Sequence, residues 1–246
     1  MGKKELQSYS KILKEVFNFD ASPVAIKRAQ ASGESINKGK VRMCRAILDA
    51  AEGKTLTLCR ENNACFGASW HLGFSKMEDP KMLKMVKQFV VEGEKLFSSY
   101  GALDNLLSQV GDVPYNKDTC FILSPLENTE AEPELVVFVC NPEQACRLLT
   151  FVTFIDGVMP KIKIGGPTCR MAVMYPLLSS QMNISFQDYT ARKISKMDKD
   201  KLLVSIPFQS LLTIIGNIDK CSAGTAEVEY PKEFREFLQA RMSARK

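Results

Sequence analysis

Histidine and tryptophan are almost absent from this 246-residue sequence, which contains one of each, His71 and Trp70. A single histidine excludes metal sites built from several histidines and the His-Glu-x-x-His motif of zinc proteases. A Ser-His-Asp or Cys-His nucleophile would have to use His71, whose apolar setting is more typical of a hydrogen-bonded core residue. The loops Gly-x-x-x-x-Gly-Lys-Ser/Thr and Gly-x-Gly-x-x-Gly are also missing, which excludes the common nucleotide-binding cradles.

Long hydrophobic runs are missing as well. The longest, at residues 148–155, is far shorter than a membrane span, and residues 1–17 lack the apolar region and cleavage site of a signal peptide. We therefore expect a cytoplasmic protein with no membrane partner. The net charge of +5 is dispersed, without an arginine-rich stripe interleaved with aromatic residues, so we expect no nucleic-acid partner.

Cysteine, by contrast, is abundant. The chain has eight cysteines, and no two of them form a Cys-x-x-Cys pair, which excludes the usual zinc ribbon and thioredoxin motifs. In the cytoplasm most of them would be reduced thiols. Apolar surroundings predict core positions for Cys120, Cys140 and Cys146. Cys59 at the end of a predicted strand and Cys221 in a predicted loop have no evident role.

Hydrophobic periodicity predicts helices mixed with short strands, an α+β fold. The letters NPEQ at the start of residues 141–154 predict a capped helix with proline in its first turn. Residues 161–164, with the sequence KIKI, are predicted to form a strand. Residues 80–97 carry a methionine-rich apolar stripe, which predicts a long helix that faces the core.

Two parts of the chain resemble each other. The Cys-Arg pairs at 44–45 and 169–170 are each followed by a predicted helix, a turn and a short strand. This similarity predicts an internal duplication. We expect two similar α/β halves, residues 1–112 and 113–246, related by a pseudo-twofold axis and packed as one compact unit. The oligomeric state is not predicted.

Several motifs in order, CRAILDAA, ENNACFGASWHLGF, FVCNPEQACRLL and GGPTCRMAVMYPLL, carry a family resemblance. Together they resemble the domain-of-unknown-function 169 family, uncharacterised proteins of archaea and mostly anaerobic bacteria. The resemblance covers residues 22–218. It implies cysteines at the positions of Cys44, Cys65 and Cys169, and often a fourth near Tyr189, where this chain reads DYTARK and has none. It implies a cysteine set and no particular reaction.

Three thiolates from distant parts of a chain can hold a [4Fe–4S] cluster and leave one iron open to a small substrate. Zinc bound by cysteines fits the same ligands. Cys44, Cys65 and Cys169 are therefore the candidate metal ligands. The interpretation is a cysteine-ligated iron–sulfur or other metal protein that acts on or binds a small anionic molecule in anaerobic metabolism. Whether it is an enzyme is open.

Further candidate residues follow from charge and backbone pattern. Arg45, Arg170 and His71 are the candidate catalytic residues. The backbone ahead of a predicted helix and two cationic side chains are candidate contacts for an anion or cofactor: Gly165, Gly166, Thr168, Arg192 and Lys27. Two alternatives are a non-catalytic module that binds a small anion or cofactor with reduced thiols only, and an accessory subunit of an anaerobic enzyme.

Overall fold

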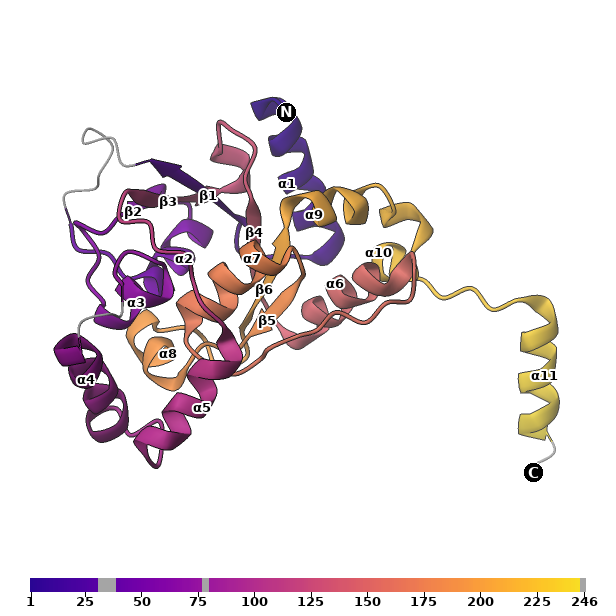
Figure 1. The fold of residues 1–246 in the computed structure, drawn as a ribbon. Helices are drawn as coiled ribbons and strands as arrows, with labels where there is room; N and C mark the ends of the chain where they lie inside the picture. The colour runs from indigo at the N-terminus through magenta and orange to yellow at the C-terminus, as the bar shows by residue number, and fades with distance from the viewer. Residues whose placement is uncertain (31–38, 77–79, 244–246) are drawn as a thin grey trace.

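The computed structural model describes residues 1–30, 39–76 and 80–243, and its strands form one antiparallel sheet in the order β2-β3-β1-β4-β6-β5 (Figure 1). Together with the surrounding helices this sheet confirms the prediction of an α+β fold. The strands are β1 (Val24–Gln30), β2 (Leu56–Leu58), β3 (Thr119–Pro125), β4 (Leu135–Cys140), β5 (Asn183–Ser185) and β6 (Leu202–Pro207).

Helices connect and cover these strands (Figure 1). The α-helices are α1 (Lys3–Phe17), α2 (Met43–Ala51), α3 (Phe66–His71), α4 (Pro80–Gln88), α5 (Tyr100–Val110), α6 (Pro142–Phe154), α7 (Tyr175–Ser179), α8 (Tyr189–Ser195), α9 (Phe208–Ile215), α10 (Ser222–Thr225) and α11 (Lys232–Ser243). Short π-helices η1 (Phe89–Gly93) and η3 (Cys169–Met174) and 3₁₀ turns η2 (Leu126–Asn128) and η4 (Ile218–Lys220) complete the described chain. No helix in the described ranges is long and apolar enough to cross a membrane.

The centre of the sheet supplies most of the core. Strand β4 is apolar throughout and almost wholly buried between its neighbours β1 and β6, as expected for a strand covered on both faces. Helix α2 packs against β3 and β4, while α9 packs against β4 and β6. Aromatic rings of Phe17, Phe19, Phe138 and Phe151 stack or meet edge to face in this core, with ring centroids 5.3–5.7 Å apart.

The strand order reads the same from either edge when β1, β2 and β3 are matched with β4, β5 and β6. The matched pairs β2 and β5 are the edges, β3 and β6 follow, and β1 pairs with β4 at the centre. This order alone does not establish a duplication. The pseudo-twofold relation and the boundary between residues 112 and 113 stay predictions.

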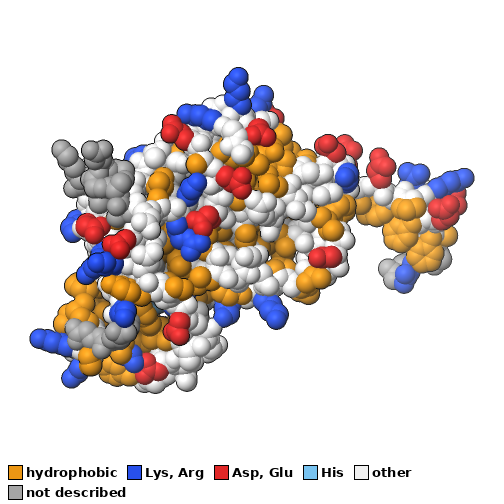
Figure 2. All heavy atoms as spheres, turned by 45° about the horizontal axis from the view of Figure 1, so that its top comes forward, with side chains coloured by type: hydrophobic (Ala, Val, Ile, Leu, Met, Phe, Trp, Pro, Cys, Tyr) orange, Lys and Arg blue, Asp and Glu red, His pale blue; other side chains and the backbone are white. Residues whose placement is uncertain are grey.

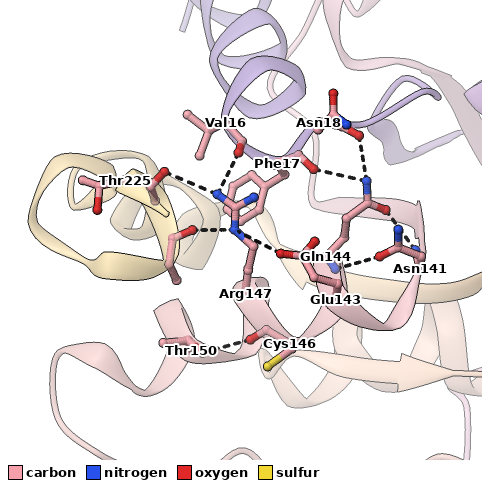
Figure 3. Close-up of polar contacts among 12 residues, drawn as sticks. Val16, Phe17, Asn18, Asn141, Glu143, Gln144, Cys146, Arg147, Thr150 and Thr225 are labelled. Atoms are coloured by element: carbon pink, nitrogen blue, oxygen red, sulfur yellow. Dashed lines mark hydrogen bonds and ion pairs between the residues drawn. The ribbon is translucent and has the colours of Figure 1, made fainter. Parts of the chain in front are cut away.

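Helix α6 confirms the predicted start and joins three parts of the chain (Figure 3). Asn141 accepts the Gln144 backbone N–H at 2.9 Å, and the Gln144 side chain accepts the Asn141 N–H at 2.9 Å, a complete capping box. The Gln144 amide also donates to the carbonyl oxygens of Phe17 and Asn18. One turn later Arg147 donates to the carbonyl oxygens of Val16 and of α10, so that α6 fastens α1 to α10.

Two predicted elements are wrong. Residues 161–164 form no strand, because the side chain of Asn183 accepts from Lys163 N and donates to Lys163 O, which replaces a strand partner. The methionine-rich stripe of α4 does not face the core: none of its residues is buried, Met85 is 46% exposed, and Phe89 after it is 60% exposed. Figure 2 shows hydrophobic side chains gathered at the end of the molecule that holds α4.

Candidate functional site

Three cysteines of the predicted site stand at helix starts. Cys44 is the second residue of α2, Cys65 precedes the first residue of α3, and Cys169 is the first residue of η3. Helix α2 packs against α8, and α3 packs against η3. In each of these pairs the fold brings together elements that are about a hundred residues or more apart in sequence. The three thiols stand at the starts of α2, α3 and η3.

Burial and neighbouring groups raise the pKa values of two of these thiols. Burial, followed by Cys65 and Asp188, raises the pKa of Cys44 to about 11. Burial, followed by Cys65, Cys44 and Asp188, raises the pKa of Cys169 well above its ordinary value. Both thiols are therefore protonated and poorly nucleophilic at neutral pH. Cys65 and Cys169 are only partly buried, whereas Cys44 is buried.

Asp188 is the carboxylate of this cluster, and its oxygens are already used. It precedes α8 and accepts the Ala191 N–H at 2.7 Å as a helix cap. Its second oxygen accepts from the backbone N–H and the hydroxyl of Thr168, at 3.2 and 3.1 Å. Asp188 thus ties the start of η3 to the start of α8, which fixes Cys169 beside α8.

The interpretation as an iron–sulfur or other metal protein is wrong. Across residues 1–30, 39–76 and 80–243, no group of three or more His, Cys, Asp or Glu side chains is arranged to hold a metal ion. The three thiols interact electrostatically without forming such a group. The oxygens of Asp188 already accept hydrogen bonds from Thr168 and Ala191. The expected [4Fe–4S] cluster or zinc therefore has no ligand group in this part of the chain.

Cys59 and Cys120 form a disulfide between neighbouring strands. The register places Leu58 of β2 opposite Phe121 of β3, so the next residues, Cys59 and Cys120, also face each other, with Cα atoms 4.3 Å apart. The other six cysteines are free. Cys120 lies in the core as predicted, but the two cysteines are bonded to each other and are not reduced thiols. Cys146, predicted in the core, is exposed because it lies on the outer face of α6.

A pocket of about 350 Å³ lies beside α3, within the size range of small-molecule sites. Its lining combines two cationic side chains, several aromatic rings and apolar residues of α4: Arg60, Lys76, Phe66, Trp70, Phe74, Tyr115, Met82 and Val86, with Ser69 and Ser75 between them. None of these described lining residues is Asp or Glu. The Lys76 ammonium lies 5.4 Å from the centre of the Tyr115 ring, and Phe66 is 67% exposed.

Helix α3 presents different residues to the pocket and to the protein interior. At about 100° per residue, one side of the helix carries Phe66, Ser69 and Trp70, and the opposite side carries Ala68, His71 and Leu72. The first set lines the pocket, and the second set is buried. The Trp70 and His71 rings stack with centroids 4.7 Å apart. Burial, followed by the charge of Arg170, lowers the pKa of His71 to about 3.

Comparison with known proteins identifies the family. The family model DUF169, described as "Uncharacterised ArCR, COG2043", matches residues 12–217. The chain belongs to the DUF169 family. "Uncharacterized protein MJ0308" of Methanocaldococcus jannaschii is 24% identical over 228 residues, which cover 89% of this chain and 96% of that protein. No solved structure matches the chain.

The DUF169 match includes the thiol cluster, the pocket and every predicted anion contact, and leaves α11 outside. Several of those predicted anion contacts already interact with protein groups. Gly165 and Gly166 are partly or fully exposed, and Thr168 is bonded to Asp188. Arg192 donates to the carbonyl oxygens of residues 186, 198 and 199, and the charge of Lys27 in β1 acts on Glu134. Their role as anion contacts stays a prediction.

The predicted catalytic residues of this DUF169 member do not all share the same contacts. Arg45 forms ion pairs with Asp49 and Glu52 and donates to Ser195 O, which joins α2 to α8. Arg170 and His71 are buried together beneath the face of α3 that points away from the pocket. Sequence reasoning missed Arg60, Lys76 and Tyr115, since each comes from a different segment and no local pattern marks it.

Proposed function

We propose that this DUF169 protein binds a small organic anion with an apolar or aromatic body in the pocket beside α3. The observation that carries the proposal is the composition of that pocket. Arg60 stands in it with the exposed rings of Phe66 and Tyr115, and the Lys76 ammonium lies over the Tyr115 ring. Arg60 makes no hydrogen bond or ion pair within the described chain, so its guanidinium is available to a carboxylate or phosphate group.

The pocket favours a flat or apolar ligand body for a physical reason. Phe66, Trp70 and Tyr115 offer ring faces on which a planar group can stack, and Met82 and Val86 supply adaptable apolar surface. Cys65 precedes Phe66 directly, so a reduced thiol stands next to this lining. A cytoplasmic location and a role in anaerobic metabolism stay predictions, and the Cys59–Cys120 disulfide is uncommon in a reducing compartment.

The single tryptophan makes the proposal directly testable. Since Trp70 lines the pocket and is the chain's only tryptophan, its fluorescence should report occupancy without labelling. We expect benzoate or phenyl phosphate to change the Trp70 emission with a saturable dependence on concentration. The uncharged benzamide should bind much more weakly, because it offers no charge to Arg60 and Lys76.

A matched pair of variants tests the role of charge. Arg60→Ala is expected to weaken binding by about tenfold or more, the loss typical of a charge-assisted hydrogen bond. Arg235→Ala on α11 removes one exposed arginine outside the pocket and should leave the affinity unchanged. The proposal is wrong if no anion changes the emission, if benzamide binds as well as benzoate, or if both variants weaken binding equally.

A further inference from the structure

Arg170 is a buried guanidinium that the protein itself leaves largely unpaired. The residue is 1% exposed, in the first turn of η3. Its Nη2 atom donates to the Gly111 carbonyl oxygen at 2.6 Å, whereas Nε and Nη1 have no hydrogen-bond partner in the described chain. Burying a charge without a partner is costly, and native proteins ordinarily supply a carboxylate or several carbonyl groups to such a side chain.

A second unpaired nitrogen lies close to the same guanidinium. His71 is 7% exposed on the inner side of α3, which packs against η3, and its Nδ1 atom has no partner among the described residues. Arg170 belongs to η3, on which α3 packs, and its charge contributes to lowering the pKa of this imidazole. Asp112 acts on Arg170 electrostatically, yet it forms no ion pair with it in the described chain.

We propose that Arg170 and His71 form a buried binding site for an oxyanion, a carboxylate or a phosphate group. The anion's oxygens would accept hydrogen bonds from Arg170 Nε and Nη1 and from the neutral imidazole through its Nδ1–H. A guanidinium suits this role because it donates from several fixed positions around one delocalised charge. One anion would then satisfy the three orphaned nitrogens and neutralise the buried charge.

This site is distinct from the proposed pocket. Neither Arg170 nor His71 lines that pocket, and the pocket cations Arg60 and Lys76 make no described contact with Arg170. The failure of one proposal therefore leaves the other standing.

Thermal stability in different anions tests the site. The unfolding midpoint of the wild-type protein is measured in sodium acetate, sodium phosphate and sodium chloride at equal ionic strength and pH. A bound anion stabilises the folded state by mass action, so we expect a rise of several degrees in acetate or in phosphate over chloride. Which of the two salts acts tells whether a carboxylate or a phosphate is the ligand.

Variants separate this site from general salt effects and from the pocket. Arg170→Met should abolish the difference between oxyanion and chloride, while Arg60→Ala should keep it. If Arg170 is only an unpaired buried cation, Arg170→Met will raise the midpoint equally in all three salts, which overturns the proposal. An absent oxyanion effect in the wild type, or the same effect in Arg170→Met, also overturns it.

A second measurement uses the wild-type protein alone. His71 is the only histidine, so one pair of ring-proton signals in the NMR spectrum belongs to it. Titration with the active oxyanion should shift these signals with saturation, and an equal concentration of chloride should not. Unchanged His71 signals at anion concentrations that raise the midpoint would place the bound anion elsewhere and refute the site.

Discussion

Acidification should destabilise this protein through His71 well before most carboxylates titrate. The imidazole is buried, its Nδ1 atom lacks a partner in the described chain, and a buried cation lies near it. Burial, followed by the charge of Arg170, lowers the pKa of His71 to about 3. In the unfolded chain the same histidine has a pKa of about 6.5.

The direction and size of the effect follow from proton linkage. Because the folded-state pKa is the lower one, the stabilisation by neutral His71 is complete above about pH 6.5 and is lost as the pH falls toward 3. Between pH 6 and pH 4 the free energy of unfolding should fall by about 1.4 kcal/mol per pH unit. At pH 5 the loss relative to pH 8 is about 2 kcal/mol.

Urea denaturation at pH 7, 6 and 5 measures this loss, in sulfonate or amine buffers that supply no carboxylate or phosphate. His71→Phe serves as the control, since it keeps an aromatic ring beside Trp70 and removes the titrating group. Carboxylates whose folded-state pKa is lowered, such as Glu127 and Glu134, also lose stability on acidification, but equally in both proteins. The difference between the two proteins therefore isolates the histidine.

Two results would refute this reasoning. One is an equal loss of stability in wild type and His71→Phe between pH 7 and pH 5. The other is an NMR titration of the folded protein in which the single histidine changes protonation near pH 6.5. Either result would mean that water or a counter-charge reaches His71 and that the imidazole is not held neutral.

The cysteines give two further predictions. Iodoacetamide at pH 7.5, followed by mass spectrometry, should label Cys65 faster than Cys44. A pKa of about 11 leaves Cys44 with about a hundredfold less thiolate than an ordinary thiol has. Equal labelling rates would contradict the buried environment of Cys44. Cys59→Ala should lower the free energy of unfolding by about 4 kcal/mol, since the bond to Cys120 closes a loop with a sequence separation of 61 residues. Dithiothreitol should lower the free energy of unfolding of the wild type by the same amount, whereas Cys146→Ala should change it little. A wild type whose stability does not respond to the reductant would show that no disulfide forms.

Elements with local signals could be predicted from the sequence. The capped start of α6 needs only Asn141, Pro142 and Gln144, which are neighbours, and the structure shows that capping box. Strand β4 is apolar on both faces, a pattern that is visible in the sequence and is typical of a central strand. The α+β class follows from such elements without knowledge of how they meet.

Local patterns do not show features that depend on partners far away in the sequence. The strand predicted at residues 161–164 is absent because a side chain from residue 183 takes its backbone groups, which no local pattern shows. The apolar stripe of α4 indicated one apolar face and did not reveal that nothing in the described chain buries it. The three cysteines act on one another electrostatically, yet they form no metal-ligand group in the described chain, because ligand geometry depends on side-chain directions that spacing along the chain does not determine.

Helix α3 contributes residues to both proposed sites. Its small residue Ala68 is buried on the side away from the pocket, and α3 packs on η3. The same turn places Trp70 in the lining of the pocket and His71 on the buried side, with the two rings stacked. Because stacked rings on one helix cannot move independently, the pocket and the buried guanidinium share a rigid wall. The mixture of cysteine, small residues, tryptophan and histidine in ACFGASWH therefore follows from geometry: each residue type suits the side of α3 that it faces.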